Sequence, residues 1–172
     1  MDQTTSTPPR LLVLMGVSGA GKTSVGEALA PKLGAVFLDG DAFHPEANIA
    51  KMSRGEPLDD ADRAPWLDRI GHIMRDEPGR VVMGCSALKR AYRTRIERAA
   101  GEPVLFVLLE GSPALIRERI AHRRNHFMPP ALLDSQFAAL EPPGPDENAI
   151  RVSVKGPTRK VVDAILRRLR AM

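Results

Sequence analysis

The chain has very little cysteine and few aromatic side chains. One of its 172 residues is cysteine, and 4% are aromatic. A single cysteine cannot form an internal disulfide, which excludes a disulfide-stapled domain and is typical of a reducing compartment. So few aromatic rings also disfavour a surface on which nucleic-acid bases stack.

Long apolar segments are missing too. The longest apolar runs are about five to seven residues, whereas roughly 20 are needed to span a bilayer. The first ten residues, MDQTTSTPPR, contain no apolar signal core. A hydrophobic fraction of 43% nevertheless argues against disorder. We therefore expect one cytoplasmic domain at residues 10–172 after a flexible tail at residues 1–9, with no membrane contact.

Basic charge is concentrated near the C-terminus. The formal net charge is +4, and residues 151–172 carry seven bases and one acid. A basic surface of this kind could bind nucleic acid, and it could equally bind a small polyanion such as ATP.

Short apolar runs alternate with stretches of helical periodicity. Continuous runs at 11–15, 35–38, 81–83 and 104–109 are typical of strands buried on both faces, and 150–154 alternates as an edge strand does. Apolar residues at helical spacing follow the first, third, fourth and fifth runs. This alternation predicts a three-layer α/β/α fold around a five-stranded parallel sheet.

Residues 16–23, GVSGAGKT, fit the phosphate-binding pattern G-x-x-x-x-G-K-[ST]. The segment lies directly between the first buried strand and a helix pattern, which is the context the motif requires. Lys22 can reach the β- and γ-phosphates of ATP, and the Thr23 hydroxyl can bind Mg²⁺. Backbone N–H groups can surround the phosphates along the loop, at Gly16, Val17, Ser18, Gly19, Ala20 and Gly21.

A phosphate loop alone leaves three classes open: small-molecule kinases, GTPases and larger ATPases. The guanine-reading pattern N-K-x-D is absent, and the D-x-x-G at residues 76–79 precedes a strand rather than following one. The third strand ends in Gly84-Cys85-Ser86, without the acid that motor ATPases use there. The sequence therefore favours a small-molecule kinase.

Two acids follow the second strand, at Asp39 and Asp41. Ligands of open α/β sheets bind at the carboxyl ends of the strands. One carboxylate there could hold a water bound to Mg²⁺ while the other orients an acceptor hydroxyl. The alternative is a solvated turn.

Residues 44–67 are polar and rich in glycine and proline, which predicts a functional loop. The blocks D-G-D-A-F-H-P, N-I-x-K-M and G-x-P-L-x-D-x-D-R-x-P-W-L run from 39 to 67. C-S-A-L-K-R-x-Y-R, R-x-x-H-F-M-P and L-L-x-S-Q-F follow in order. Together they resemble the bacterial-type gluconate kinases over about residues 11–170.

The resemblance implies a nucleoside-monophosphate-kinase-like fold with a short lid at about residues 124–129. It implies transfer of the γ-phosphoryl group of ATP to the 6-hydroxyl of D-gluconate with Mg²⁺, without nucleic acid, and a possible homodimer. The alternatives are a kinase for another hydroxy acid such as shikimate, and a non-catalytic nucleotide-binding module that binds RNA.

On the nucleotide side, the resemblance implies that Arg119 lies against adenine and that Arg123 reaches the transferring phosphate. Both arginines could instead interact with the dipole at the end of their helix. The resemblance assigns Mg²⁺ to Thr23 and, through water, to Asp39. The implied catalytic residues are Lys22, Asp41 and Arg123.

On the acceptor side, Asp41 is assigned to the sugar hydroxyl and Arg63 to the gluconate carboxylate, which suits a planar guanidinium. His44, Ser86 and Lys89 are the other implied ligands. Arg63 could instead form a helix-start salt bridge, His44 could cap a turn, and Lys89 could be a solvated helix lysine.

Overall fold

A computed structural model describes residues 7–122 and 130–172, and these residues form a parallel sheet of five strands. The strand order is β2-β3-β1-β4-β5. Each predicted strand is present, and the edge strand alternates between buried and exposed side chains as expected. The strands are β1 (Leu11–Met15), β2 (Ala35–Asp39), β3 (Arg80–Gly84), β4 (Val104–Glu110) and β5 (Ala149–Ser153).

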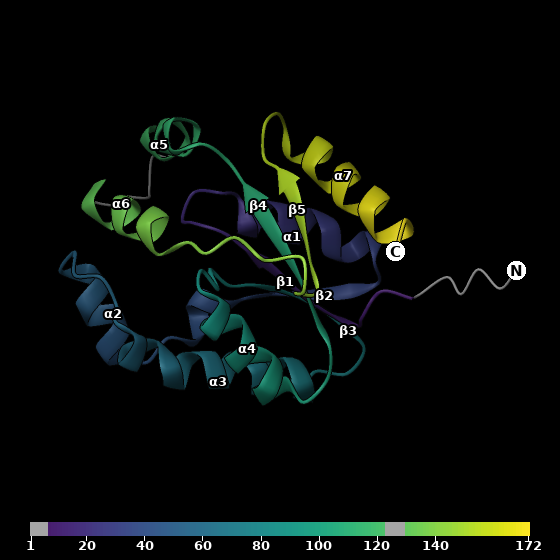
Figure 1. The fold of residues 1–172 in the computed structure, drawn as a ribbon, viewed down its shortest axis with the longest axis horizontal. Helices are drawn as coiled ribbons and strands as arrows, with labels where there is room; N and C mark the ends of the chain where they lie inside the picture. Colours follow the sequence, from purple (N-terminus) through teal and green to yellow (C-terminus); the bar gives the residue numbers. More distant parts are fainter. Residues whose placement is uncertain (1–6, 123–129) are drawn as a thin grey trace, which may run out of the picture.

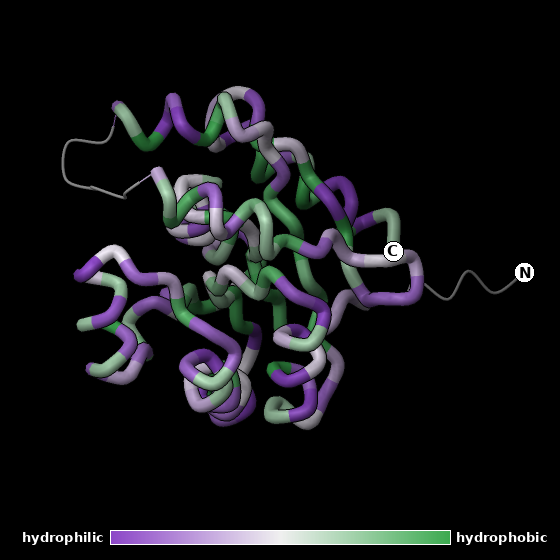
Figure 2. The backbone as a smooth tube through the Cα atoms, turned by 60° about the vertical axis from the view of Figure 1, so that its left-hand side comes forward, coloured by the Kyte–Doolittle hydropathy of each residue, from purple (hydrophilic) through white to green (hydrophobic). Residues whose placement is uncertain are grey.

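Helices cover both faces of the sheet and complete the predicted three layers (Figure 1). Alternate residues of β1 enter opposite cores: Leu12 and Leu14 pack with α1 and α7, and Leu11 and Val13 pack with α3 and α4. The apolar strands lie inside, and the hydrophilic segments lie around them (Figure 2). The covering helices are α1 (Lys22–Lys32), α3 (Asp60–Asp76), α4 (Arg90–Ala100) and α7 (Thr158–Arg170).

The prediction of a loop at residues 44–67 is wrong, because this segment is mostly helical. It forms α2 (Glu46–Ser53) and the first half of α3. Asp59 and Asp62 form a reciprocal capping box that starts α3, and Trp66 begins the helix's buried face. The polar first turn hides this helix from a search for apolar periodicity.

Two further helices lie beside the sheet, α5 (Pro113–Ala121) and α6 (Pro130–Ala139). Sequence periodicity predicts α5 but not α6. The predicted lid at residues 124–129 lies outside the described residues. Among the helices of the described residues, none is both long enough and apolar enough to cross a bilayer.

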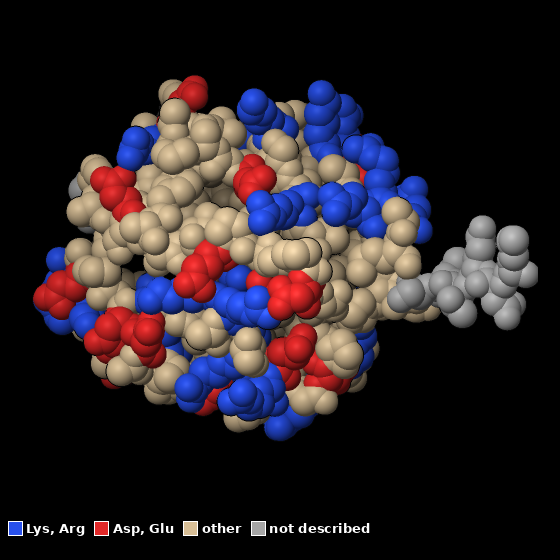
Figure 3. Space-filling view, in the orientation of Figure 1, with Lys and Arg blue, Asp and Glu red and all other residues tan. Residues whose placement is uncertain are grey.

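The basic C-terminal segment is largely helix α7. Lys and Arg side chains gather at one corner of the molecule, whereas acids and bases are interspersed over the lower part (Figure 3). Three arginines, Arg167, Arg168 and Arg170, occupy the last turn of α7. That turn is the favourable end of a helix for positive charge.

Parallel pairing brings the carboxyl ends of β1, β2 and β3 to one edge of the sheet. There the Gly16 amide donates to the Ser86 carbonyl at 3.1 Å, which joins the loop after β1 to the loop after β3. The short 3₁₀ helix η1 (Gly40–Phe43) continues from β2, and Trp66 Nε1 donates to the Gly40 carbonyl at 2.9 Å. These contacts hold the three loops together.

The close approach of η1 to β3 generates a first prediction. A Cβ atom at Gly40 would lie 2.4 Å from the Gly84 carbonyl oxygen, a backbone atom that cannot rotate away. We expect Gly40→Ala to lower the free energy of unfolding by about 1–3 kcal/mol, as overpacking typically does. Urea unfolding measures this, and exposed Ala42→Ser in the same turn is the control. Equal stability of the two variants would contradict the argument.

Candidate active site

The predicted phosphate loop joins β1 to α1 with the required backbone conformation. Gly19 has a φ of 85° and Gly21 a φ of 96°, in the left-handed region that favours glycine. Gly21 caps α1, so Lys22 begins the helix. Lys22 Nζ donates to the Gly16 carbonyl at 2.9 Å and to the Val17 carbonyl at 3.1 Å. The loop therefore places Lys22 beside its glycines at the N-terminus of α1, a position suited to phosphate.

A cavity of about 300 Å³ opens beside the loop. Six of the predicted site residues line it: Ser18, Lys22, Asp41, His44, Arg63 and Ser86. The structure thus brings phosphate-binding and acceptor-binding candidates from four separate segments into one space. Its size suits a small molecule rather than a polymer.

The two predicted acids are held in different ways. Asp39 Oδ1 accepts from the Asp41 amide at 3.0 Å and thereby caps η1. The Asp41 side chain is 74% exposed and lines the cavity. Asp39 therefore shapes the turn, and Asp41 exposes its carboxylate in the cavity.

His44 packs against the indole ring of Trp66, with ring centroids 4.0 Å apart and an interplanar angle of 17°. Its Nδ1 lies 3.2 Å from Asn48 Nδ2, and its Nε2 lies 3.9 Å from Asp41 Oδ1. Burial lowers the pKa of His44, and Arg63 lowers it further, against the opposing effect of Asp41. The ring therefore favours its neutral form.

Arg63 points from the first turn of α3 toward α4. Its Nη1 donates to the Leu58 carbonyl and, at 3.3 Å, to Tyr92 Oη, and the guanidinium lies over the Tyr92 ring at 5.4 Å. The nearby Asp62 carboxylate instead pairs with Lys51 at 2.7 Å. Arg63 is thus oriented by neutral groups while it lines the cavity, which favours a ligand role over the helix-start salt bridge.

Lys89 is not among the six predicted residues that line the cavity, although it lies beside the same Tyr92 ring as Arg63. Its Nζ pairs with Asp60 Oδ1 at 3.3 Å and lies 5.6 Å from the centre of the Tyr92 ring. Hydrogen bonds from Tyr92 and Lys89 lower the pKa of Asp60. The acceptor role of Lys89 therefore stays a prediction.

A buried arginine, Arg93, supports the loop that carries Ser86. Arg93 donates to the Ala87 carbonyl at 2.9 Å and pairs with Glu147 at 2.7 Å. Ala87 has a φ of 45°, a conformation that is costly for a residue with a Cβ atom. Backbone strain of this kind is typical of loops that position a functional group, here Ser86 beside Gly16.

A second cleft of about 490 Å³ lies on the other side of the phosphate loop. Gly19, Gly21, Arg119 and Thr158 line it. Arg119 Nη2 donates to the Val154 carbonyl and, at 3.3 Å, to the Gly156 carbonyl. The predicted adenine-side residue therefore lies where a base could extend from phosphates on the loop. Arg123, the predicted phosphate ligand, lies outside the described residues.

Sequence reasoning assigned no role to three residues that shape the site. Trp66 forms one wall, Asn48 contacts the His44 ring, and Gln136 Oε1 accepts from the Ser18 amide at 2.6 Å. Each of the three lies in one of the quoted motif blocks. Its role at the site depends on a contact with a residue of another turn or element, which the motif does not indicate. Cys85 is fully buried, and burial raises the pKa of its thiol to about 12, so it packs rather than reacts.

The phosphate loop lies between two clefts. One has room for a base, and the other is lined by an acid and an arginine, and this arrangement defines a P-loop kinase of small molecules. A family model described as an AAA domain matches residues 11–143. The gluconokinase of Gluconobacter oxydans is 47% identical over 166 residues, covering 95% of this chain and 93% of that protein. The thermosensitive gluconokinase of Escherichia coli is 48% identical over 143 residues, covering 80% and 75%.

A solved structure agrees with these relatives. The crystal structure of a gluconokinase from Sinorhizobium meliloti has a TM-score of 0.86 and 46% identity, covering 92% of this chain and 90% of that one. The chain belongs to the gluconokinase family.

The buried His44 ring generates a prediction for stability against pH. Its pKa is lowered in the folded state, so below the unfolded value of about 6.5 the unfolded chain binds the extra proton and unfolding becomes easier. Wild type should therefore lose more unfolding free energy than His44→Gln between pH 7.5 and 5.5. Acids with lowered pKa values, such as Asp60, respond below about pH 4, outside this window. Parallel urea titrations measure the effect, and equal losses would contradict it.

Proposed function

We propose that this protein transfers the γ-phosphoryl group of ATP to the 6-hydroxyl of D-gluconate. One observation carries the proposal: a single cavity joins Lys22 of the phosphate loop to an acid, Asp41, and a cation, Arg63. Gluconate has a carboxylate at one end and a primary hydroxyl at the other, which complements this pair of charges. The gluconokinases that resemble this chain support the same acceptor.

In the proposed reaction, the acceptor oxygen attacks the γ-phosphorus in line with the bond to the β-phosphate oxygen. That bond breaks, ADP leaves, and the hydroxyl proton passes to Asp41. Lys22 and the loop amides stabilise negative charge on the phosphate oxygens. Arg63 holds the distant carboxylate, so that binding energy away from the reacting atoms orients the hydroxyl.

Thr23 and Asp39 are the proposed Mg²⁺ residues. Thr23 is exposed in the first turn of α1, and Asp39 ends β2 at the same edge of the sheet. A hydroxyl and a carboxylate that acts through water are oxygen donors of the kind Mg²⁺ prefers. When bound, the ion would neutralise charge on the β- and γ-phosphates. Phosphate contact by Arg123, a homodimer and a cytoplasmic location remain predictions.

The acceptor is tested by a coupled ADP-release assay with gluconate, shikimate, glycerate and no acceptor. We expect ATP turnover that saturates with gluconate and is low with the other additions. Turnover with shikimate but not gluconate would refute the proposed acceptor and leave the kinase class intact. Turnover equal in all four would refute transfer to a sugar acid.

Lys22→Ala tests the phosphate loop. Because the Lys22 amine stabilises charge that develops in the transition state, its loss should lower kcat by about 10³-fold or more. Steady-state kinetics measure this, and thermal unfolding confirms that the variant is folded. A folded variant that keeps more than about a tenth of the wild-type rate would remove Lys22 from the mechanism.

Arg63→Ala tests the carboxylate anchor. Loss of a charge-assisted hydrogen bond costs about 1.5–3 kcal/mol, which corresponds to a rise in gluconate KM of roughly 10- to 150-fold. The KM for ATP should change little. Lys89→Ala is the matched control. It also removes a cation beside the Tyr92 ring, but this cation pairs with Asp60. A gluconate KM that responds to Lys89→Ala and ignores Arg63→Ala would move the anchor to Lys89.

A further inference from the structure

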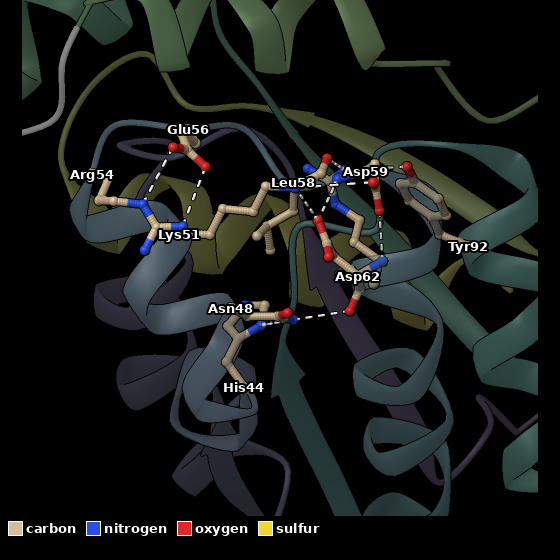
Figure 4. A network of polar contacts seen from close by, with 10 residues as sticks. His44, Asn48, Lys51, Arg54, Glu56, Leu58, Asp59, Asp62 and Tyr92 are labelled. Carbon is tan, nitrogen blue, oxygen red and sulfur yellow. Dashed lines mark hydrogen bonds and ion pairs between the residues drawn. The ribbon is translucent and has the colours of Figure 1, made fainter.

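Asn48 is a buried polar residue at the side of the acceptor cavity, next to His44. Its side chain lies within the polar network between α2 and the start of α3 (Figure 4). The residue is 4% exposed, and its Nδ2 donates to the Asp62 carbonyl at 3.0 Å. The same Nδ2 lies 3.2 Å from His44 Nδ1.

These two contacts determine which nitrogen of His44 carries the proton. The Asp62 carbonyl only accepts, so the atom facing it must be the amide nitrogen of Asn48 and not its oxygen. An amide nitrogen only donates, so its second N–H donates to His44 Nδ1. Nδ1 is therefore an acceptor, and in the neutral ring the proton is on Nε2.

The Nε2 atom lies on the side of the ring that faces Asp41. The distance of 3.9 Å to Asp41 Oδ1 is too long for a hydrogen bond, and both residues line the acceptor cavity. One oxygen atom can lie within about 2.9 Å of both atoms. His44 would donate to that oxygen through Nε2–H, and Asp41 would accept from it.

We propose that Asn48 is a positioning residue that fixes His44 as an Nε2–H donor, so that His44 and Asp41 together bind one hydroxyl group of the acceptor. This inference rests on the proposed function, since it concerns the same cavity. A hydroxyl group both donates and accepts, and it satisfies the pair. A carboxylate only accepts and would face Asp41 with like charge, so this end of the cavity selects hydroxyl and leaves the carboxylate to Arg63.

The reverse tautomer would abolish this selectivity. With the proton on Nδ1, the lone pair of Nε2 and the Asp41 carboxylate would both be acceptors. A hydroxyl group could then satisfy one of them and would leave the other unpaired. The groups around the ring agree with the neutral Nε2–H form. Trp66 stacks on the ring and Asn48 contacts Nδ1, and burial together with Arg63 lowers the pKa of His44 against the opposing effect of Asp41.

The tautomer is measured directly by long-range ¹H–¹⁵N correlation NMR of protein labelled at histidine nitrogen, at pH 7.5 and without substrate. The chain has four histidines, and loss of signals in His44→Gln assigns the relevant ring. We expect His44 Nδ1 to be unprotonated in wild type. In Asn48→Asp the introduced carboxylate only accepts, so Nδ1 should become protonated.

Lys51→Ala is the matched structural control. Lys51 also joins α2 to Asp62, through an ion pair of 2.7 Å, and its second ion pair is with Asp59 rather than with the His44 ring. Removing it should loosen the same two helices and leave the ¹⁵N pattern of His44 unchanged. A wild-type spectrum with Nδ1 protonated would overturn the proposal, whatever the variants do.

A double-mutant cycle connects the tautomer to the acceptor. Asn48→Ala should raise the KM for gluconate about 2- to 10-fold, as expected for one hydrogen bond, and leave the KM for ATP within about twofold. His44→Gln keeps an amide N–H near the position of Nε2 but has no Nδ1 for Asn48 to contact. In that background Asn48→Ala should change gluconate KM by less than about twofold, because the coupling has been removed.

The cycle separates positioning from a purely structural role. If Asn48 acts only through Asp62, its substitution will raise gluconate KM equally in both backgrounds, and the proposal is overturned. If wild type does not phosphorylate gluconate, the proposed function fails. The NMR spectra need no substrate and still decide whether Asn48 sets the proton on His44.

Discussion

Parallel pairing of β1 with β3, and of β3 with β2, is the constraint on which the site depends. It places three strand ends at one edge, where the Gly16 amide binds the Ser86 carbonyl. Three short segments therefore meet at this edge: the phosphate loop, the η1 turn with Asp41, and the loop that carries Ser86. Mutual support between these loops explains how a small domain can hold phosphate-binding and acceptor-binding groups in one cavity.

Contacts between α2 and the start of α3 hold one wall of the cavity in place. Asp62 accepts from Asn48 through its carbonyl and pairs with Lys51 through its carboxylate, while its amide is capped by Asp59. The start of α3 is thereby fixed, and with it the directions of Arg63 and Trp66. Local polar contacts on the cavity wall thus set the positions of the groups that face the substrate.

The layers, the strands and the phosphate loop are predictable from sequence, because buried parallel strands are continuous apolar runs and G-x-x-x-x-G-K-[ST] has one backbone solution. Asp41, His44, Arg63 and Ser86 line one cavity, since each lies in a block beside a strand end or a helix start, and their roles there stay predictions. Apolar periodicity does not predict α2 or α3: polar residues form the capping box that opens α3, and α2 begins after Pro45 without a side-chain cap. The contacts of Asn48 and Gln136 depend on which rotamers meet across elements, and sequence spacing contains no such information.

We propose that this cavity directs the γ-phosphoryl group of ATP to one end of gluconate. The most direct measurement is the position of the phosphate in the product, from phosphorus–proton coupling in NMR spectra of a reaction containing the enzyme, ATP, Mg²⁺ and gluconate. The account predicts a single phosphoester coupled to the two protons on C6. A phosphoester at another carbon, or release of inorganic phosphate without a sugar phosphate, would contradict it.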